Sequence, residues 1–414
     1  MTLEMTREPA RTATSARRTA GLLERTARQA VHGRLRTLRH GRLRIIDAHG
    51  SLEFGPDDAD LTAVVTVRNP AFWTAVALRG SVGAGESYMN GDWTSDDLTT
   101  LVRILVRDRA TLEGVERGLA RFAVPALKLF HAFRRNTRTG SARNIAAHYD
   151  LGNDFYALWL DPSLMYSCAY FERDGATLDE AQFAKNDRLC RLLRLAPGDH
   201  LLEIGTGWGG FAIHAARNFG CRVTTTTISR AQHELATRRV AKAGLADRIE
   251  VLLCDYRELE GRFDKLVSIE MIEAVGHEFY GAFFSACDRL LAEGGLMALQ
   301  TITIRDELYE RARTSVDFIQ RHVFPGSSIP SIAALRAAAA RSGRLAIHST
   351  TDIGPHYATT LRMWRARFEA RLPQVRALGF DDRFIRMWRF YLAYCEGGFA
   401  ERQIGDAQML LARR

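Results

Sequence analysis

The sequence has no apolar run that approaches the roughly 20 residues needed to cross a bilayer. Its basic N-terminus is not followed by an apolar segment, so we do not expect a secretory signal peptide. The six cysteines are scattered, and none forms a CxxC pair or a Cys/His cluster with the spacing of metal ligands. We therefore expect free thiols, no metal site and a cytoplasmic location.

Sequence signals of two further ligand classes are also missing. No Gly-Lys-Ser/Thr phosphate-binding loop occurs, which argues against a P-loop nucleotidase. No Asn/Asp-Pro-Pro-Tyr or Pro-Cys motif of nucleic-acid methyltransferases occurs either, so we expect no nucleic-acid partner.

The composition is otherwise that of a folded globular chain, with 46% hydrophobic and 25% charged residues among 414. The net charge is +9, and residues 7–44 contain eleven arginines against two acidic residues. Such a segment favours a polyanionic surface. Residues 1–35 are interpreted as a basic leader that need not be ordered, although residues 16–44 also have a helical pattern of leucine and valine.

Residues 36–140 are predicted to form a small α+β domain of lipid-binding type followed by a linker helix. Residues 43–54 alternate between apolar and polar side chains and are broken at Gly50, which predicts a hairpin. A further strand is predicted over residues 61–67 and a helix over residues 69–78. A helical pattern over residues 112–138 combines an apolar face with a basic end. That helix could lie on a membrane interface or pack on its own protein.

Residues 141–414 alternate strand and helix patterns, which predicts a doubly wound, mostly parallel α/β sheet. The expected strands cover residues 200–205, 221–227, 249–254, 263–269, 295–302 and 344–350. The expected helices cover residues 209–218, 230–243, 280–291 and 332–342. Ligands of such sheets bind beyond the carboxyl ends of the strands.

A strand, a glycine-rich turn and the start of a helix occupy residues 200–216, the pattern of a nucleotide-like binding site. The second strand ends in Thr and Ser without the carboxylate that would hold a ribose of NAD. Glu203 in the first strand, together with Asp255 and Tyr256 after the third, suits S-adenosylmethionine better. Glu270 and Glu273 follow the fourth strand, and one of them is expected to serve the chemistry while the other is structural.

Six ordered motifs carry a resemblance to a known family. They are HYDLGNDFY, YSCAYFE, LLEIGTGWGG, IEMIEAVGH, FPGSSIPS and GPHYATTL, between residue 144 and about residue 410. In this order they resemble the cyclopropane fatty acid synthases, whose relatives include the mycolic acid cyclopropane synthases. The resemblance implies a Rossmann-like class I methyltransferase sheet with helical additions.

The resemblance implies that S-adenosylmethionine alkylates the double bond of an unsaturated acyl chain, in many members on intact phospholipid. The resulting carbocation loses a proton to a bound bicarbonate ion and closes to a cyclopropane. Carried over by motif, Cys168, Glu273 and Tyr357 would hold that ion. Gln300 stands where family members have His, and it cannot take a proton at neutral pH. Ile302 and Tyr149 complete the catalytic set that we expect.

The resemblance also implies a cofactor site, a membrane-surface partner and a homodimer. The residues expected around S-adenosylmethionine are Tyr166, Ser167, Glu203, Gly205, Gly207, Trp208, Thr227, Gln232, Asp255 and Tyr256. The substrate would be unsaturated phospholipid at an anionic inner membrane surface, reached from the cytoplasm.

Several outcomes remain open from the sequence alone. If the proton leaves the chain rather than the transferred methyl, the product would be a methylene or, after reduction, a methyl-branched fatty acid, and Gln300 favours this alternative. Methyl transfer to a small polar molecule and a non-catalytic lipid-binding protein are the more distant alternatives.

Overall fold

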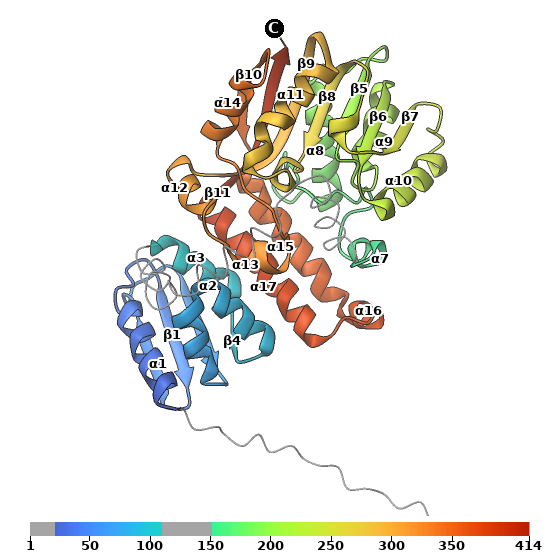
Figure 1. Cartoon of the computed structure of the whole chain (residues 1–414). Helices are drawn as coiled ribbons and strands as arrows, with labels where there is room; N and C mark the ends of the chain where they lie inside the picture. Colours follow the sequence, from blue (N-terminus) through green and yellow to red (C-terminus); the bar gives the residue numbers. More distant parts are fainter. Residues whose placement is uncertain (1–20, 110–150, 414) are drawn as a thin grey trace, which may run out of the picture.

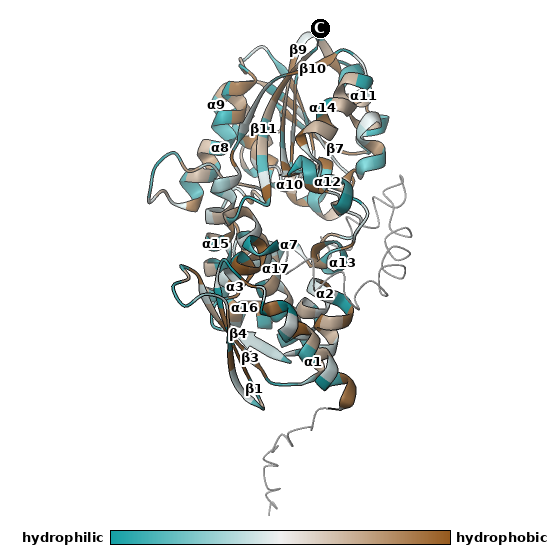
Figure 2. Ribbon diagram, turned by 90° about the vertical axis from the view of Figure 1, so that its left-hand side faces the viewer, coloured by the Kyte–Doolittle hydropathy of each residue, from teal (hydrophilic) through white to brown (hydrophobic). Residues whose placement is uncertain are grey.

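The computed structural model describes residues 21–109 and 151–413 (Figure 1). A small sheet domain lies at one end and a larger sheet domain at the other, with α15 (Gly354–Ala370) and α17 (Asp382–Ala400) between them (Figure 1). The same arrangement is visible after a quarter turn (Figure 2).

The small domain has a four-stranded sheet in the order β2-β1-β3-β4. Its strands are β1 (Arg42–Asp47), β2 (Gly50–Phe54), β3 (Thr62–Val67) and β4 (Trp93–Ser95). The predicted hairpin over residues 43–54 is confirmed, because β1 and β2 pair antiparallel from Leu43–Phe54 to Asp47–Gly50. The strand predicted over residues 61–67 is β3, which pairs parallel with β1.

Three helices pack on this sheet: α1 (Leu22–Leu35), α2 (Ala71–Asn90) and α3 (Leu98–Arg107). α1 buries Val31 and Leu35 in the same core as β1, so residues 22–35 lie with the small domain rather than in a separate leader. α2 extends the predicted helix by twelve residues and is interrupted at Gly80, whose φ of 55° is non-helical. The predicted helix over residues 112–138 and the boundary near residue 140 lie outside the described residues.

The larger domain contains a seven-stranded sheet in the order β10-β11-β9-β8-β5-β6-β7. Its strands are β5 (His200–Ile204), β6 (Arg222–Thr227), β7 (Ile249–Leu253), β8 (Phe263–Ile269), β9 (Leu291–Ile304), β10 (Leu345–Asp352) and β11 (Ile404–Arg413). Strands β5 to β9 pair in parallel, and β11 runs antiparallel to both β9 and β10. The predicted α/β fold class is confirmed, and β11 is the strand that sequence reasoning missed.

Helices cover both faces of this sheet (Figure 1). They include α7 (Asn153–Ala157), α8 (Leu178–Leu192), α9 (Gly210–Phe219), α10 (Arg230–Lys242), α11 (Tyr280–Leu290) and α14 (Ile332–Arg341). Short 3₁₀ turns follow β7 at η2 (Tyr256–Glu258) and β8 at η3 (Ile272–Ala274), and η4 (His277–Phe279) leads into α11. The additions α12 (Asp306–Ala312), α13 (Phe318–His322) and α16 (Leu372–Ala377) complete the helices described here.

Helix α17 and the residue after it join the two domains. Glu401 accepts hydrogen bonds from Nε of Arg103 at 2.6 Å and of Arg107 at 2.7 Å, both on α3. Glu396 accepts from the Thr99 hydroxyl at 3.1 Å and from Arg365 on α15. Within the described ranges, no helix is both long and apolar enough to cross a membrane.

Candidate active site

The glycine turn after β5 has a backbone that only glycine adopts readily. Gly205, Gly207 and Gly209 have φ of 105°, 52° and 81°, in the left-handed region that disfavours a side chain. A Cβ on Gly210 would lie 2.3 Å from the backbone oxygen of Ser163. The turn is therefore a cradle that keeps its backbone open to a ligand, followed at once by the N-terminus of α9.

A cavity of about 990 Å³ begins at this turn and continues between the domains. All ten residues predicted to surround a cofactor line it: Tyr166, Ser167, Glu203, Gly205, Gly207, Trp208, Thr227, Gln232, Asp255 and Tyr256. The structure thus brings the expected set together at the carboxyl ends of β5, β6 and β7, where an α/β sheet binds its ligand.

Glu203 and Asp255, the two acidic residues of this set, have different hydrogen-bond partners. Glu203 is buried, accepts a hydrogen bond from the Thr225 hydroxyl at 2.6 Å, and has its pKa raised to about 8 because burial disfavours the charged form. Asp255 accepts from Nε of Arg257 at 2.8 Å and from its terminal nitrogen at 2.5 Å. The raised pKa of Glu203 favours its neutral acid.

Three of the predicted catalytic residues converge on one carboxylate, and it belongs to Glu270. Its Oε1 accepts from the backbone N–H of Cys168 at 2.7 Å and from Nε2 of Gln300 at 2.9 Å. Its Oε2 accepts from the Tyr357 hydroxyl at 2.6 Å. Glu270 lines the cavity, whereas Cys168 and Gln300 are fully buried behind it.

The sequence motif assigned the catalytic carboxylate to Glu273, whereas the structure places Glu270 against these three donors. β8 ends at Ile269, and the chain turns at Glu270 with a φ of 46°. The register pairs Ile269 with Gln300, so Glu270 emerges beside Gln300. Glu273 lies further on, in η3, where its Oε1 accepts from the Thr301 hydroxyl at 2.9 Å and the Ile302 N–H at 2.5 Å.

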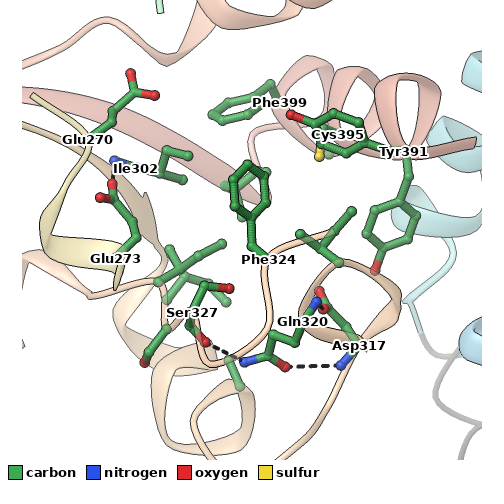
Figure 3. Close-up of a pocket in the computed structure, with 18 of the residues that line it drawn as sticks. Glu270, Glu273, Ile302, Asp317, Gln320, Phe324, Ser327, Tyr391, Cys395 and Phe399 are labelled. Atoms are coloured by element: carbon green, nitrogen blue, oxygen red, sulfur yellow. Dashed lines mark hydrogen bonds between the residues drawn. The ribbon is translucent and has the colours of Figure 1, made fainter. Parts of the chain in front are cut away.

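The two glutamates differ in protonation as well as in position. Burial, followed by the nearby charge of Glu270, raises the pKa of Glu273 to about 8. Glu273 lines the same cavity, and Figure 3 shows it with Glu270 and Ile302 on one side of the pocket. A neutral Glu273 is consistent with the structural role that sequence reasoning expected for one member of the pair.

Comparison with known proteins gives a consistent result. Residues 136–409 match the family model described as mycolic acid cyclopropane synthetase, which is well over half of the chain. The chain belongs to this family. It is therefore an enzyme of the S-adenosylmethionine-dependent methyltransferase type.

Individual relatives of the cyclopropane synthetase family extend over most of the chain. The chain is 38% identical over 397 residues to "Tuberculostearic acid methyltransferase UfaA1" of Mycobacterium tuberculosis, covering 94% of this chain and 92% of that protein. It is 36% identical to "Cyclopropane-fatty-acyl-phospholipid synthase" of Escherichia coli K12, covering 85% and 88%.

Solved structures agree for the larger domain. The mycolic acid cyclopropane synthase CmaA1 complexed with SAH and CTAB superposes with a TM-score of 0.62 at 36% identity, over 66% of this chain and 98% of that one. Coclaurine N-methyltransferase, at 22% identity and a TM-score of 0.55, shares the fold.

The bicarbonate ion expected from the family resemblance does not fit these residues. The Cys168 N–H, the Gln300 amide and the Tyr357 hydroxyl all donate to Glu270. The second hydrogen bond of the Gln300 amide goes to the Cys168 carbonyl oxygen at 3.3 Å. The donors that would bind a separate anion are thus already used by a carboxylate of the chain itself.

Two buried ionisable residues, Asp406 and Lys185, lie behind Glu270. Asp406 on β11 is fully buried, and no N–H or O–H group of residues 21–109 and 151–413 donates to its carboxyl oxygens. Burial and the adjacent charge of Glu270 hold the pKa of Asp406 well above its usual range, which favours the neutral acid. Lys185 donates to the Ser167 hydroxyl at 3.0 Å, and burial lowers its pKa to about 8.

Aromatic side chains form the rest of the wall. Tyr357 and Phe399 stack with ring centroids 4.4 Å apart, and Tyr166 stacks on Phe324 at 6.1 Å. Figure 3 shows Phe324 between the glutamates and the α17 residues Tyr391, Cys395 and Phe399. Such ring faces attract a cation without acting as nucleophiles. Burial raises the pKa of the Cys168 thiol, so this sulfur also stays a neutral, weak nucleophile.

Sequence reasoning did not single out Lys185 or Asp406. It chose Glu273 as the catalytic carboxylate, whereas the donors of Cys168, Gln300 and Tyr357 favour Glu270. Asp406 could not be placed, because β11 was not predicted. The proximity of Glu270 to Gln300 could have been predicted, because placing the end of the predicted strand β8 beside β9 brings the two residues together. Tyr149, the remaining predicted catalytic residue, lies outside the described residues. Among the residues described, no group of three or more His, Cys, Asp or Glu has the arrangement of a metal site.

Proposed function

We propose that this protein transfers the methyl group of S-adenosylmethionine to the double bond of an unsaturated acyl chain in a membrane lipid. The observation that carries the proposal is the Glu270 carboxylate, which three donors hold at the wall of an aromatic cavity that begins at the glycine turn. An enzyme that methylates polar molecules would not need this apolar surface beside its base.

The glycine turn fits the proposed cofactor because a Cβ would fill the cradle. Gly205 and Gly207 would let the backbone approach it, while Gln232 and Tyr256 would line its remaining contacts. When bound, S-adenosylmethionine supplies an electrophilic methyl group on a sulfonium. CmaA1, solved with SAH, is a relative whose structure supports this cofactor.

The chain's own residues would manage the charge and the proton of the reaction. With S-adenosylmethionine bound, the alkene π electrons would form the new bond to its methyl carbon, and the electrons of the methyl–sulfur bond would remain on sulfur. The positive charge left on the acyl chain faces the rings of Phe324 and Phe399. Glu270 then accepts a proton from the transferred methyl, and the electrons of that C–H bond close a cyclopropane ring.

A methylene or methyl-branched product is the second candidate. The relative named "Tuberculostearic acid methyltransferase UfaA1", which aligns with 94% of the chain, supports it because its name gives methyl transfer rather than cyclopropane formation. A methylene requires a hydrogen to shift between the two former alkene carbons before Glu270 removes a proton from the transferred methyl. Loss of a chain proton, which we first linked to this product, does not give a methylene. Loss of a proton from the chain carbon instead would leave a methyl branch.

The positive charge of the chain supports an anionic membrane as the surface that holds the proposed substrate. Eleven arginines within residues 7–44 and a net charge of +9 would attract an anionic membrane. Relatives named for phospholipid and mycolic acid substrates support an acyl-lipid acceptor.

The proposed base is tested by replacing Glu270 in the full-length protein. Glu270→Gln keeps the hydrogen-bonding shape but removes the base, so turnover of phosphatidylglycerol with oleoyl chains should fall by roughly 10²–10⁴. Cofactor binding, measured by calorimetry, should stay within a few-fold. Glu310→Gln, an exposed control, should leave both unchanged.

A second variant separates loss of the base from loss of the fold. Glu270→Gly suits the positive φ and frees the donors of Cys168, Gln300 and Tyr357. Added formate or bicarbonate should restore part of its turnover. Wild-type turnover in Glu270→Gln would overturn the assignment of Glu270 as the base.

A further inference from the structure

The cavity does not end at the catalytic residues but continues into the small domain. Its walls there come from α1, β1, β3 and α2 and include Val31, Leu35, Leu43, Ile45, Val65 and Val76. These side chains are at most 8% exposed. They are therefore shielded from the outside of the domain but border an internal space.

Such a space is unusual for a domain core. Protein interiors pack as densely as organic crystals and leave few voids larger than a water molecule. An apolar cavity that remains empty lowers stability in proportion to its volume. A hollow core in a four-stranded domain therefore indicates a ligand that fills it.

The passage between the two parts of the cavity is itself apolar. Leu101 and Leu105 on α3 line it from the small domain, and Phe390 and Phe399 on α17 line it from the large domain. α2 contributes residues 80–82, where the helix is interrupted at Gly80. The hollow core is thus continuous with the wall that carries Tyr357 and Glu270.

Charge divides the cavity into two ends. The side chains contributed by α1, β1 and β3 are all apolar, whereas the arginines that line the cavity include Arg79 beside Gly80 on α2, and Arg109, Arg311 and Arg313 where α3 ends near α12. A lipid headgroup or a carboxyl end would lose hydration at the apolar end without finding a polar partner. Only the methyl end of a hydrocarbon chain matches that part.

We propose that the core of the small domain is a chamber for the methyl-terminal part of a lipid acyl chain while the reacting double bond lies beside Glu270. This inference rests on the proposed function for the nature of the lipid. The chain in the chamber is either the reacting chain or its sister chain in the same lipid, and the chemistry of recognition is the same.

Filling the chamber tests the proposal by activity. Val65→Phe on β3 adds volume to the chamber, so kcat/KM for dioleoyl phosphatidylglycerol should fall at least about tenfold while shorter acyl chains lose less. Val64→Phe, the neighbouring residue on the opposite face of β3, is the matched control and should stay within about twofold. Equal losses for both variants on all chain lengths would overturn the proposal.

Crosslinking tests the same point without a variant. Vesicles of phosphatidylglycerol would carry a diazirine at the methyl end of either the unsaturated chain or a saturated sister chain. Illumination should label peptides within residues 31–105 from one of the two probes, which identifies the chain. Active wild-type enzyme that is labelled only within residues 151–413 by both probes would overturn the chamber, whereas an enzyme without lipid turnover would instead overturn the proposed function.

Discussion

At the scale of single residues, the site depends on a carboxylate held in an uncommon backbone conformation. Glu270 has a φ of 46°, and a non-glycine residue in that region costs of order 1 kcal/mol or more. Hydrogen bonds from Cys168, Gln300 and Tyr357 hold the side chain in place. The strain is concentrated at the residue to which we assign the proton transfer.

The sequence predicted most of this residue set but not its centre. The motifs identified Cys168, Gln300 and Tyr357, and the pair Glu270 and Glu273 was recognised as one functional and one structural carboxylate. Which is which depends on the backbone turn after β8 and on the register with β9. Neither is a local property of the sequence, so the choice required the structure.

Glu203 gives a prediction for the pH dependence of stability. Its pKa is raised from about 4.5 to about 8 by burial, so the folded state binds a proton that the unfolded state releases between these values. The associated stability is fully present below pH 4.5 and is lost as the pH rises through 8. Glu203→Gln lacks this titration and should gain roughly 3 kcal/mol relative to wild type between pH 5 and pH 8.

Urea unfolding of both proteins without cofactor, at a series of pH values, measures this difference. A constant difference across the range would show that Glu203 is ionised in the folded protein.

At the scale of elements, the glycine turn was predicted and β11 was not. The turn is a local pattern of strand, glycines and helix. The residues of β11 combine glycine, acidic and amide side chains with apolar ones, a pattern that does not by itself predict a strand. They form a strand because β9 and β10 pair with the backbone of β11 on both sides. It then supplies Asp406 and Gln408 to the buried polar groups around Gln300, where the amide of Gln408 donates to Gln300 at 3.0 Å.

Gly210 tests the packing of the turn. Gly210→Ala should place a Cβ against the Ser163 backbone oxygen, forcing the turn or the facing loop to move and costing about 2 kcal/mol. Affinity for S-adenosylmethionine should fall at least tenfold. Gly198→Ala is the control because its Cβ meets nothing within 4 Å, and it should be neutral or slightly stabilising.

Thermal unfolding and calorimetric titration of the two variants decide this point. Equal melting temperatures and affinities for both would mean that the turn has room for a side chain.

At the scale of the whole molecule, two sheet domains share helix α17 and one cavity. The sequence predicted two domains from the change in pattern, with a different α/β organisation in each. It could not predict the hollow core of the small domain, because side chains such as Val65 and Leu43 read as ordinary core positions. A void arises from the packing of several elements together and has no signature in any one of them.

Glu401 tests the connection between the domains. Glu401→Gln weakens two partly buried ion pairs to Arg103 and Arg107, so we expect a loss of roughly 1 kcal/mol in the free energy of unfolding. Hydrogen exchange should quicken mainly in α3 and the adjacent small sheet. Glu293→Gln, which removes an exposed pair with Arg344, is the control and should change little. Uniformly faster exchange over both domains would argue against a local connection.

The most direct test of the account follows the hydrogens of the transferred methyl. The enzyme is incubated with phosphatidylglycerol that carries oleoyl chains and with S-adenosylmethionine bearing a fully deuterated methyl group, and the fatty acids are analysed by mass spectrometry and proton NMR. We predict one added carbon that retains two of the three deuterium atoms. Glu270 removes the third as a deuteron when either a cyclopropane or a methylene forms. A product that retains all three, or no added carbon at all, would contradict the account.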